Sequence, residues 1–160
     1  REQLLNKYYR PHHKKLKELV ERSLSDNDVA VIIDCHSFPD YPLPCDSDQD
    51  IPRPDICLGT DAFHTPNWLR VISEELFVAN GYEVEFNRPY SGTLVPLDHY
   101  EKNEKVLSLM IEINRRLYLD GTYQLNNEAY NKLNSLINLL YEQISKFLFI
   151  LKMNNPILRD

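Results

Sequence analysis

An abrupt change from apolar to polar residues at positions 29–39 constrains the fold of this chain more than any other feature. Residues 29–33 are apolar and mostly β-branched, which is typical of a strand buried on both faces. Polar residues from Asp34 to Ser37 follow at once. Because open α/β sheets bind ligands at the carboxyl ends of their strands, this stretch predicts an α/β fold with a functional site directly after the strand.

His36 is the candidate metal ligand in that polar stretch. An imidazole can bind a metal ion through one ring nitrogen while a neighbouring side chain orients the ring through the other. Asp34 and Ser37 are the candidates for that orienting contact. The alternative is a histidine that only caps the loop after the strand. A thiol nucleophile at Cys35 with His36 as its base is excluded, because neighbours on a strand point to opposite faces.

Hydrophobic periodicity predicts the remaining elements. Apolar residues at helical or alternating spacing are separated by loops rich in Pro, Gly and Asp. The predicted helices cover residues 4–24 (interrupted near Pro11), 67–80 and 127–152, and the other predicted strands cover residues 55–59, 82–86 and 106–113. A chain of 160 residues is long enough for one core, so we predict a single domain, residues 1–160.

A second polar cluster follows the predicted strand 82–86, in the turn from Asn87 to Gly92. Asn87, Arg88, Tyr90 and the backbone N–H groups near Gly92 are donors that could hold an anionic ligand. The alternative is an ordinary turn built around proline and glycine.

Glu112 lies in the middle of the apolar strand predicted at residues 106–113. Burial raises the pKa of a carboxyl group toward neutrality, as a general base requires. The alternatives are an outward-facing residue on an edge strand or an ion pair with Arg115.

The three polar clusters are expected to meet in space. The carboxyl ends of parallel strands lie at the same edge of a sheet, so His36, the turn 87–92 and Glu112 should converge there. Arg88 or Arg115 could then bind a substrate carboxylate through two parallel hydrogen bonds.

Charge and cysteine content argue against several kinds of partner. The net charge is −6 without any basic run, which argues against nucleic acid or an anionic membrane. The longest apolar run, residues 147–151, is too short to span a bilayer. Three cysteines without zinc-ribbon spacing predict reduced thiols in a cytoplasmic protein.

Five motifs occur in order along residues 9–118. They are Tyr9-x-Pro11-x-His13, IDCHSFP at 33–39, DICLG at 55–59, NxPYSG at 87–92 and IEINRxLY at 111–118. Together they resemble N-formylglutamate amidohydrolases.

The resemblance implies a three-layer α/β/α sandwich around a mixed, largely parallel sheet, related to the zinc carboxypeptidases. It implies that His36 binds zinc and that Glu112 activates water and carries its proton. The candidate substrate-binding residues are Asn87, Arg88, Tyr90, Ser91, Gly92 and Arg115. The implied reaction is hydrolysis of a small molecule, N-formyl-L-glutamate, to formate and glutamate.

The chain departs from the family pattern at its N-terminal side. The family carries a His-x-Gly motif and an acidic residue that would supply further zinc ligands, and nothing like it precedes Tyr9. Catalytic zinc usually has three protein ligands. We therefore expect this sequence to be the C-terminal portion of a longer amidohydrolase domain. The alternatives are a catalytically incomplete binding or scaffold domain of the same fold and a hydrolase of another N-acyl or peptide substrate.

Overall fold

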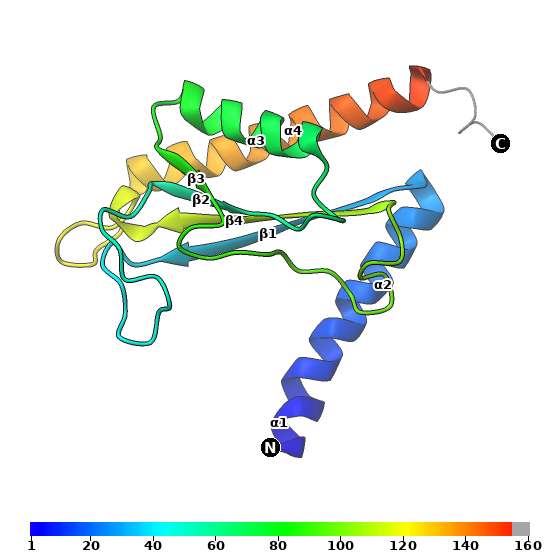
Figure 1. Cartoon of the computed structure of the whole chain (residues 1–160), viewed down its shortest axis with the longest axis horizontal. Coiled ribbons are helices and arrows are strands. Elements are labelled where there is room, and N and C mark those ends of the chain that lie inside the picture. Colours follow the sequence, from blue (N-terminus) through cyan, green and yellow to red (C-terminus); the bar gives the residue numbers. More distant parts are fainter. Residues whose placement is uncertain (155–160) are drawn as a thin grey trace.

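A four-stranded mixed sheet lies at the centre of the computed structural model, which describes residues 1–154 (Figure 1). The strands are β1 (Ala30–Phe38), β2 (Ile56–Gly59), β3 (Val84–Phe86) and β4 (Val106–Asn114), in the spatial order β1-β4-β2-β3. β1 is parallel to β4, and β2 is parallel to β3. The central pair, β2 and β4, is antiparallel. The sheet is therefore mixed and largely parallel, as expected.

Two helices cover the first face of the sheet, α3 (Asn67–Ala79) and α4 (Asn127–Asn154) (Figure 1). They pack side by side, with the rings of Trp68 and Phe147 stacked at 4.6 Å. The apolar stripe predicted for α4 is the buried one. The main core forms between these helices and the sheet, and its buried members are Ile56, Leu58, Leu69, Leu76, Phe77, Leu107, Leu109, Ile111, Leu136, Leu140 and Ile144.

β4 shows how the alternation of its sequence divides the two faces. Leu109 and Ile111 point into the main core. Successive strand residues point to opposite sides, so Ser108 and Glu112 point to the second face. Two polar side chains thus reach the second face from β4 without disturbing the core.

The second face is covered at one end by α2 (Arg10–Asn27). Val20 of α2 forms a small core with Ala30 and Val106, at the amino ends of β1 and β4. Figure 1 shows this helix running away from the sheet toward the N-terminus. Together with α3 and α4 on the first face, α2 completes the predicted three-layer α/β/α arrangement.

The expected interruption near Pro11 has another form. α1 (Glu2–Leu4), a π-helical turn (Leu5–Tyr9) and α2 follow one another without a loop. Pro11 stands in the first turn of α2, directly after the π-helical turn, so the break at the proline is a change of helical hydrogen-bond pattern and not a loop.

Two expectations for the first strand were wrong. β1 does not end at position 33 but continues to Phe38, because its polar residues still pair with β4. It is also not buried on both faces: within residues 1–154 it lies at the edge of the sheet. His36 is therefore inside a strand and not in a loop after it.

In the part of the chain that the structure describes, no helix combines the length and the apolar character needed to cross a bilayer.

Gly59 tests the close packing on the second face. A Cβ at this position would collide with the carbonyl oxygen of Gly92 and with the side chain of Met110. We expect Gly59→Ala to lower the free energy of unfolding by about 2–3 kcal/mol, the usual cost of overpacking. Gly121→Ala is the matched control, because a Cβ there meets nothing within 4 Å. Urea unfolding compares the two, and equal stabilities would contradict the packing.

Candidate active site

A row of polar side chains crosses the second face of the sheet. His36 of β1 is paired in register with Glu112 of β4, and Glu112 is paired with Cys57 of β2. Cys57 is paired in turn with Glu85 of β3. Residues paired in this way project to the same face as close neighbours. The histidine and the buried glutamate that the sequence singled out thus lie side by side.

Asp34 orients the ring of His36 from two positions earlier on the same strand. Its Oδ1 lies 2.9 Å from Nε2 of His36, so the ring donates a hydrogen bond to the carboxylate. This hydrogen bond raises the pKa of His36, and the negative charge of Glu112 adds to the effect. The contact leaves Nδ1 of the ring available for another ligand. The side chain of His36 is 49% exposed, so that nitrogen can be reached from outside.

Glu112 is the buried member of the row, with 8% of its surface exposed. Its Oε2 is enclosed and has no hydrogen-bond partner among residues 1–154. Burial raises the pKa of its carboxyl group, while the charges of His36 and Arg115 act in the opposite direction. A desolvated carboxylate with an unused oxygen is suited to accept a proton from a substrate water.

The turn 87–92 does not join the other clusters in the way that the sequence suggested. β3 runs antiparallel to β4, because β2 does, so its carboxyl end lies away from the carboxyl ends of β1 and β4. Asn87 is bonded there to the backbone N–H and hydroxyl of Thr60.

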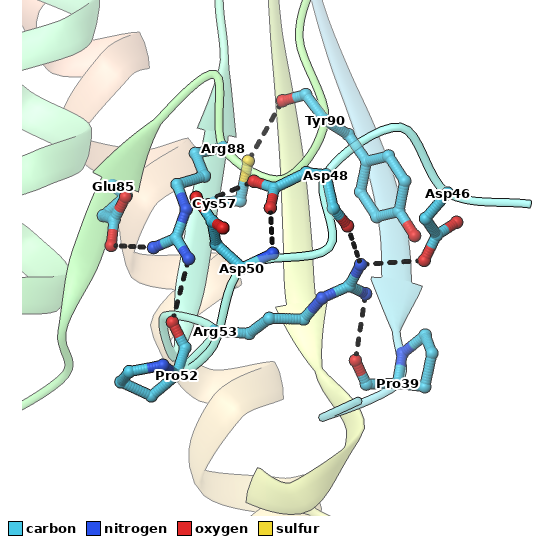
Figure 2. Close-up of polar contacts among 10 residues, drawn as sticks. All are labelled: Pro39, Asp46, Asp48, Asp50, Pro52, Arg53, Cys57, Glu85, Arg88 and Tyr90. Atoms are coloured by element: carbon cyan, nitrogen blue, oxygen red, sulfur yellow. Dashed lines mark hydrogen bonds and ion pairs between the residues drawn. The ribbon is translucent and has the colours of Figure 1, made fainter. Parts of the chain in front are cut away.

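Arg88 is likewise occupied. It binds Glu85 at 2.7 Å, Asp48 at 3.2 Å and the carbonyl oxygen of Pro52 at 3.0 Å (Figure 2). The guanidinium therefore holds two loops together, and the expected contact with a substrate carboxylate has no support in this arrangement.

The chain after Arg88 returns across the second face and brings Tyr90 to the row. The thiol of Cys57 donates to the carbonyl oxygen of Tyr90 at 3.1 Å (Figure 2). The ring of Tyr90 lies 6.0 Å from that of Phe38, at the end of β1. Ser91 is exposed, and Gly92 has a φ of 85°, which glycine adopts without strain. We call residues 88–96 the return segment.

Arg115 and Ser37 form a contact that the sequence did not predict. Arg115 donates to the hydroxyl of Ser37 at 3.2 Å and to its carbonyl oxygen at 3.1 Å. Ser37 therefore does not orient the ring of His36, because it points to the other face of β1. The charge of Arg115 still reaches Glu112.

Sequence reasoning missed two residues beside the row. Cys57 is fully buried, and burial raises the pKa of its thiol to about 11. Arg53, in the long loop before β2, is 1% exposed. A charged residue inside a Pro- and Asp-rich segment gives no periodic signal of burial, so only the alternation of β2 could have indicated Cys57.

The residues present fit part of a zinc site. His36 offers Nδ1, Asp34 holds the ring, and the enclosed Oε2 of Glu112 has no other partner. An imidazole nitrogen is a usual zinc ligand, and a carboxylate is a usual proton acceptor for the water in a zinc enzyme. Among residues 1–154, however, no group of three His, Cys, Asp or Glu side chains is arranged to hold a metal ion.

The chain that carries this row on a mixed α/β sheet is similar to one enzyme family. The model of the N-formylglutamate amidohydrolase family matches residues 1–119. The chain therefore belongs to the N-formylglutamate amidohydrolase family. Among curated proteins no significant match is found.

Two solved structures resemble the chain. The N-formylglutamate amidohydrolase from Ralstonia eutropha JMP134 shares 27% identity and a TM-score of 0.74, over 92% of this chain and 55% of that one. Gene product Atu2144 from Agrobacterium tumefaciens has 18% identity and a TM-score of 0.60, over 89% of this chain and 53% of that one. At this identity the similarity shows the fold alone. The chain spans about half the length of both.

Replacing Glu112 by Gln should stabilise the metal-free protein at neutral pH. Burial raises the folded-state pKa of Glu112. The protonated glutamate therefore contributes stability that is complete below its unfolded-state pKa and is lost as the pH rises through its folded-state pKa. Above that pH the folded protein carries a desolvated carboxylate, which glutamine would replace by a neutral group. In the presence of a chelator we expect Glu112→Gln to raise the free energy of unfolding by about 1 kcal/mol at pH 7.5.

That gain should vanish near pH 3, well below the unfolded-state pKa of glutamate, where the carboxyl group is protonated in both states. Urea unfolding at the two pH values measures it. A less stable Gln variant at pH 7.5 would show that the carboxylate is well solvated or paired.

Proposed function

We propose that the protein is a zinc-dependent amidohydrolase that hydrolyses N-formyl-L-glutamate to formate and glutamate, or a similar N-acyl amino acid to the corresponding carboxylate and the free amino acid. The observation that carries the proposal is the pairing of His36 with Glu112 on one face of the sheet, in a chain that belongs to this family. The similar Ralstonia enzyme bears the same name. We place the activity in the cytoplasm, as the reduced cysteines suggest.

In this proposal, His36 binds zinc through Nδ1, and Asp34 keeps the ring in place through Nε2. Further ligands would come from a segment N-terminal to Arg1, as the family pattern implies. The chemistry that zinc supplies when bound is Lewis acidity toward carbonyl and water oxygens.

Glu112 acts as the general base. Its Oε2 has no competing hydrogen bond, so it takes a proton from the attacking water and delivers it to the leaving amine of the amino acid. Its raised pKa makes both transfers feasible near neutral pH.

Arg115, and not Arg88, is the better candidate to bind a substrate carboxylate. It is exposed, and among residues 1–154 its side chain is bonded to Ser37, whereas Arg88 is held by Glu85 and Asp48. A guanidinium bonded through one edge retains donors for a second partner.

His36→Ala tests the metal site. We expect the gene product, expressed from its natural start codon, to contain one zinc ion per chain, and the variant to lose at least about 90% of it, since one of three ligands is removed. Atomic emission measures the zinc content. Full zinc in the variant would exclude His36 as a ligand, and absence of zinc from the parent, without hydrolysis, would favour a binding or scaffold domain.

Glu112→Gln tests the base. Zinc content should stay unchanged while kcat on N-formylglutamate falls at least about a hundredfold, because removal of a general base typically costs that much. Formate release measures the rate, and a panel of N-acyl amino acids shows which substrate is preferred. Normal turnover in this variant would exclude Glu112 as the base.

A further inference from the structure

The loop from residue 39 to 53 has no helix or strand of its own, yet besides its contacts with Arg88 and Arg116 it is held at a buried point. That point is the guanidinium of Arg53, whose side chain is completely enclosed. It binds Asp46 at 2.8 Å and the carbonyl oxygens of Asp48 at 3.1 Å and Pro39 at 3.3 Å (Figure 2). One side chain thus gathers the start and the middle of the loop.

Arg53 also joins two aromatic rings that flank the polar row. Its guanidinium carbon lies 5.9 Å from the ring centre of Phe38 and 5.8 Å from that of Tyr90. Phe38 is two residues beyond His36 on the same face of β1. Tyr90 belongs to the return segment, whose backbone is bonded to Cys57 beside Glu112.

The alternative, that Arg53 only stabilises the loop, does not account for where its contacts fall. Its ion-pair partner Asp46 lies in the loop, but both rings that it touches belong to the walls of the row. Among residues 1–154, its Nε is enclosed without a partner. The guanidinium is therefore held by its ring contacts and by the hydrogen bonds of its two terminal nitrogen atoms.

We propose that Arg53 is the positioning residue of the candidate active site: clamped by Asp46, it holds Tyr90 and the return segment over Cys57 and Glu112. It does not touch the reacting atoms. As far as catalysis is concerned, the inference rests on the proposed function, because the return segment carries the candidate substrate contacts Tyr90, Ser91 and Gly92.

The chemistry of the site calls for arginine and not merely for a positive charge. A planar guanidinium can face two rings and bind carboxylate and carbonyl oxygens at once. Lysine keeps the charge and the ion pair with Asp46 but cannot reproduce the fork. Arg53→Lys therefore removes the contacts that need a planar guanidinium and keeps the positive charge.

Cys57 reports on the clamp without any need for activity. It is buried and bonded to Tyr90, while the other two cysteines, Cys35 and Cys45, are exposed. In a Cys35→Ser, Cys45→Ser background, Cys57 is the sole thiol of the printed sequence. Its rate of reaction with a thiol reagent then measures how often the return segment opens.

We expect Arg53→Lys and Asp46→Asn to label at least about tenfold faster than this background, through local opening of the return segment. Arg116→Lys is the matched control. Arg116 is also an arginine that anchors this loop, through Asp40 and Asp55, but it does not contact Tyr90. Its variant should label within about twofold of the background.

Urea unfolding measures the global free energy of unfolding of each variant. From it follows the labelling rate expected if Cys57 reacted only in globally unfolded molecules. Unchanged labelling of Arg53→Lys, or labelling explained entirely by global unfolding, overturns the inference. Equal acceleration by Arg116→Lys overturns it too, because any anchor of the loop would then serve.

Kinetics separate this inference from the proposed function. In the zinc-loaded gene product, Arg53→Lys should raise KM about tenfold and leave kcat within about threefold, with zinc content unchanged, because a loosened wall must be ordered on binding. A fall in kcat alone would overturn the positioning role. A parent without any hydrolysis would instead refute the proposed function, and the labelling rates would still decide the position of the clamp.

Discussion

The parallel pairing of β1 with β4 is the constraint on which the site depends. Nine residue pairs run from Ala30 with Val106 to Phe38 with Asn114. Side chains on a strand alternate with a period of two, so a shift of one residue would turn His36 away from Glu112. The shift would also expose the apolar side of β4 that packs under α3 and α4. The core thus fixes the register, and the register places the polar row.

A second set of contacts fixes the carboxyl ends of the same strands. Arg116, directly after β4, binds both Asp40 and Asp55. Asn114 adds bonds to Asp40 and to the carbonyl oxygen of Pro54. These residues lie at the end of β1, at the start of β2 and at the end of β4, so one polar network joins the three strands next to the row. The site can therefore hold a buried, unpaired carboxylate oxygen, whose desolvation opposes folding, because the surrounding backbone is firmly tied.

Sequence reasoning succeeded where burial imposes a period. β4, α3 and α4 were predicted within a few residues, and the alternation of β4 already separated Glu112 from its apolar neighbours. The length of β1 was missed because its last residues are polar, although they pair with β4 as regularly as the apolar ones do. The antiparallel direction of β2 was also missed, since it depends on contacts between residues far apart in the chain.

The arginines also show that sequence reasoning does not predict contacts between residues far apart in the chain. Arg88 follows a strand and precedes proline, a position that suggested ligand binding, yet Glu85 of β3 and two loop acceptors, Asp48 and Pro52, occupy it. Arg53 gave no signal at all and turned out to be the buried one. Which carboxylates surround an arginine is decided by tertiary structure, and neither composition nor spacing records it.

From His36 to Cys57 the side chains of the row become more buried, and this gives the site a direction. The side chain of His36 is about half exposed on the edge strand, Glu112 is nearly enclosed, and Cys57 is covered by the return segment. On the Cys57 side, the clamp of Arg53 and Tyr90 closes the surface. In the proposed function, a metal ion or substrate would therefore reach Glu112 from the His36 side, past an imidazole whose orientation Asp34 already fixes.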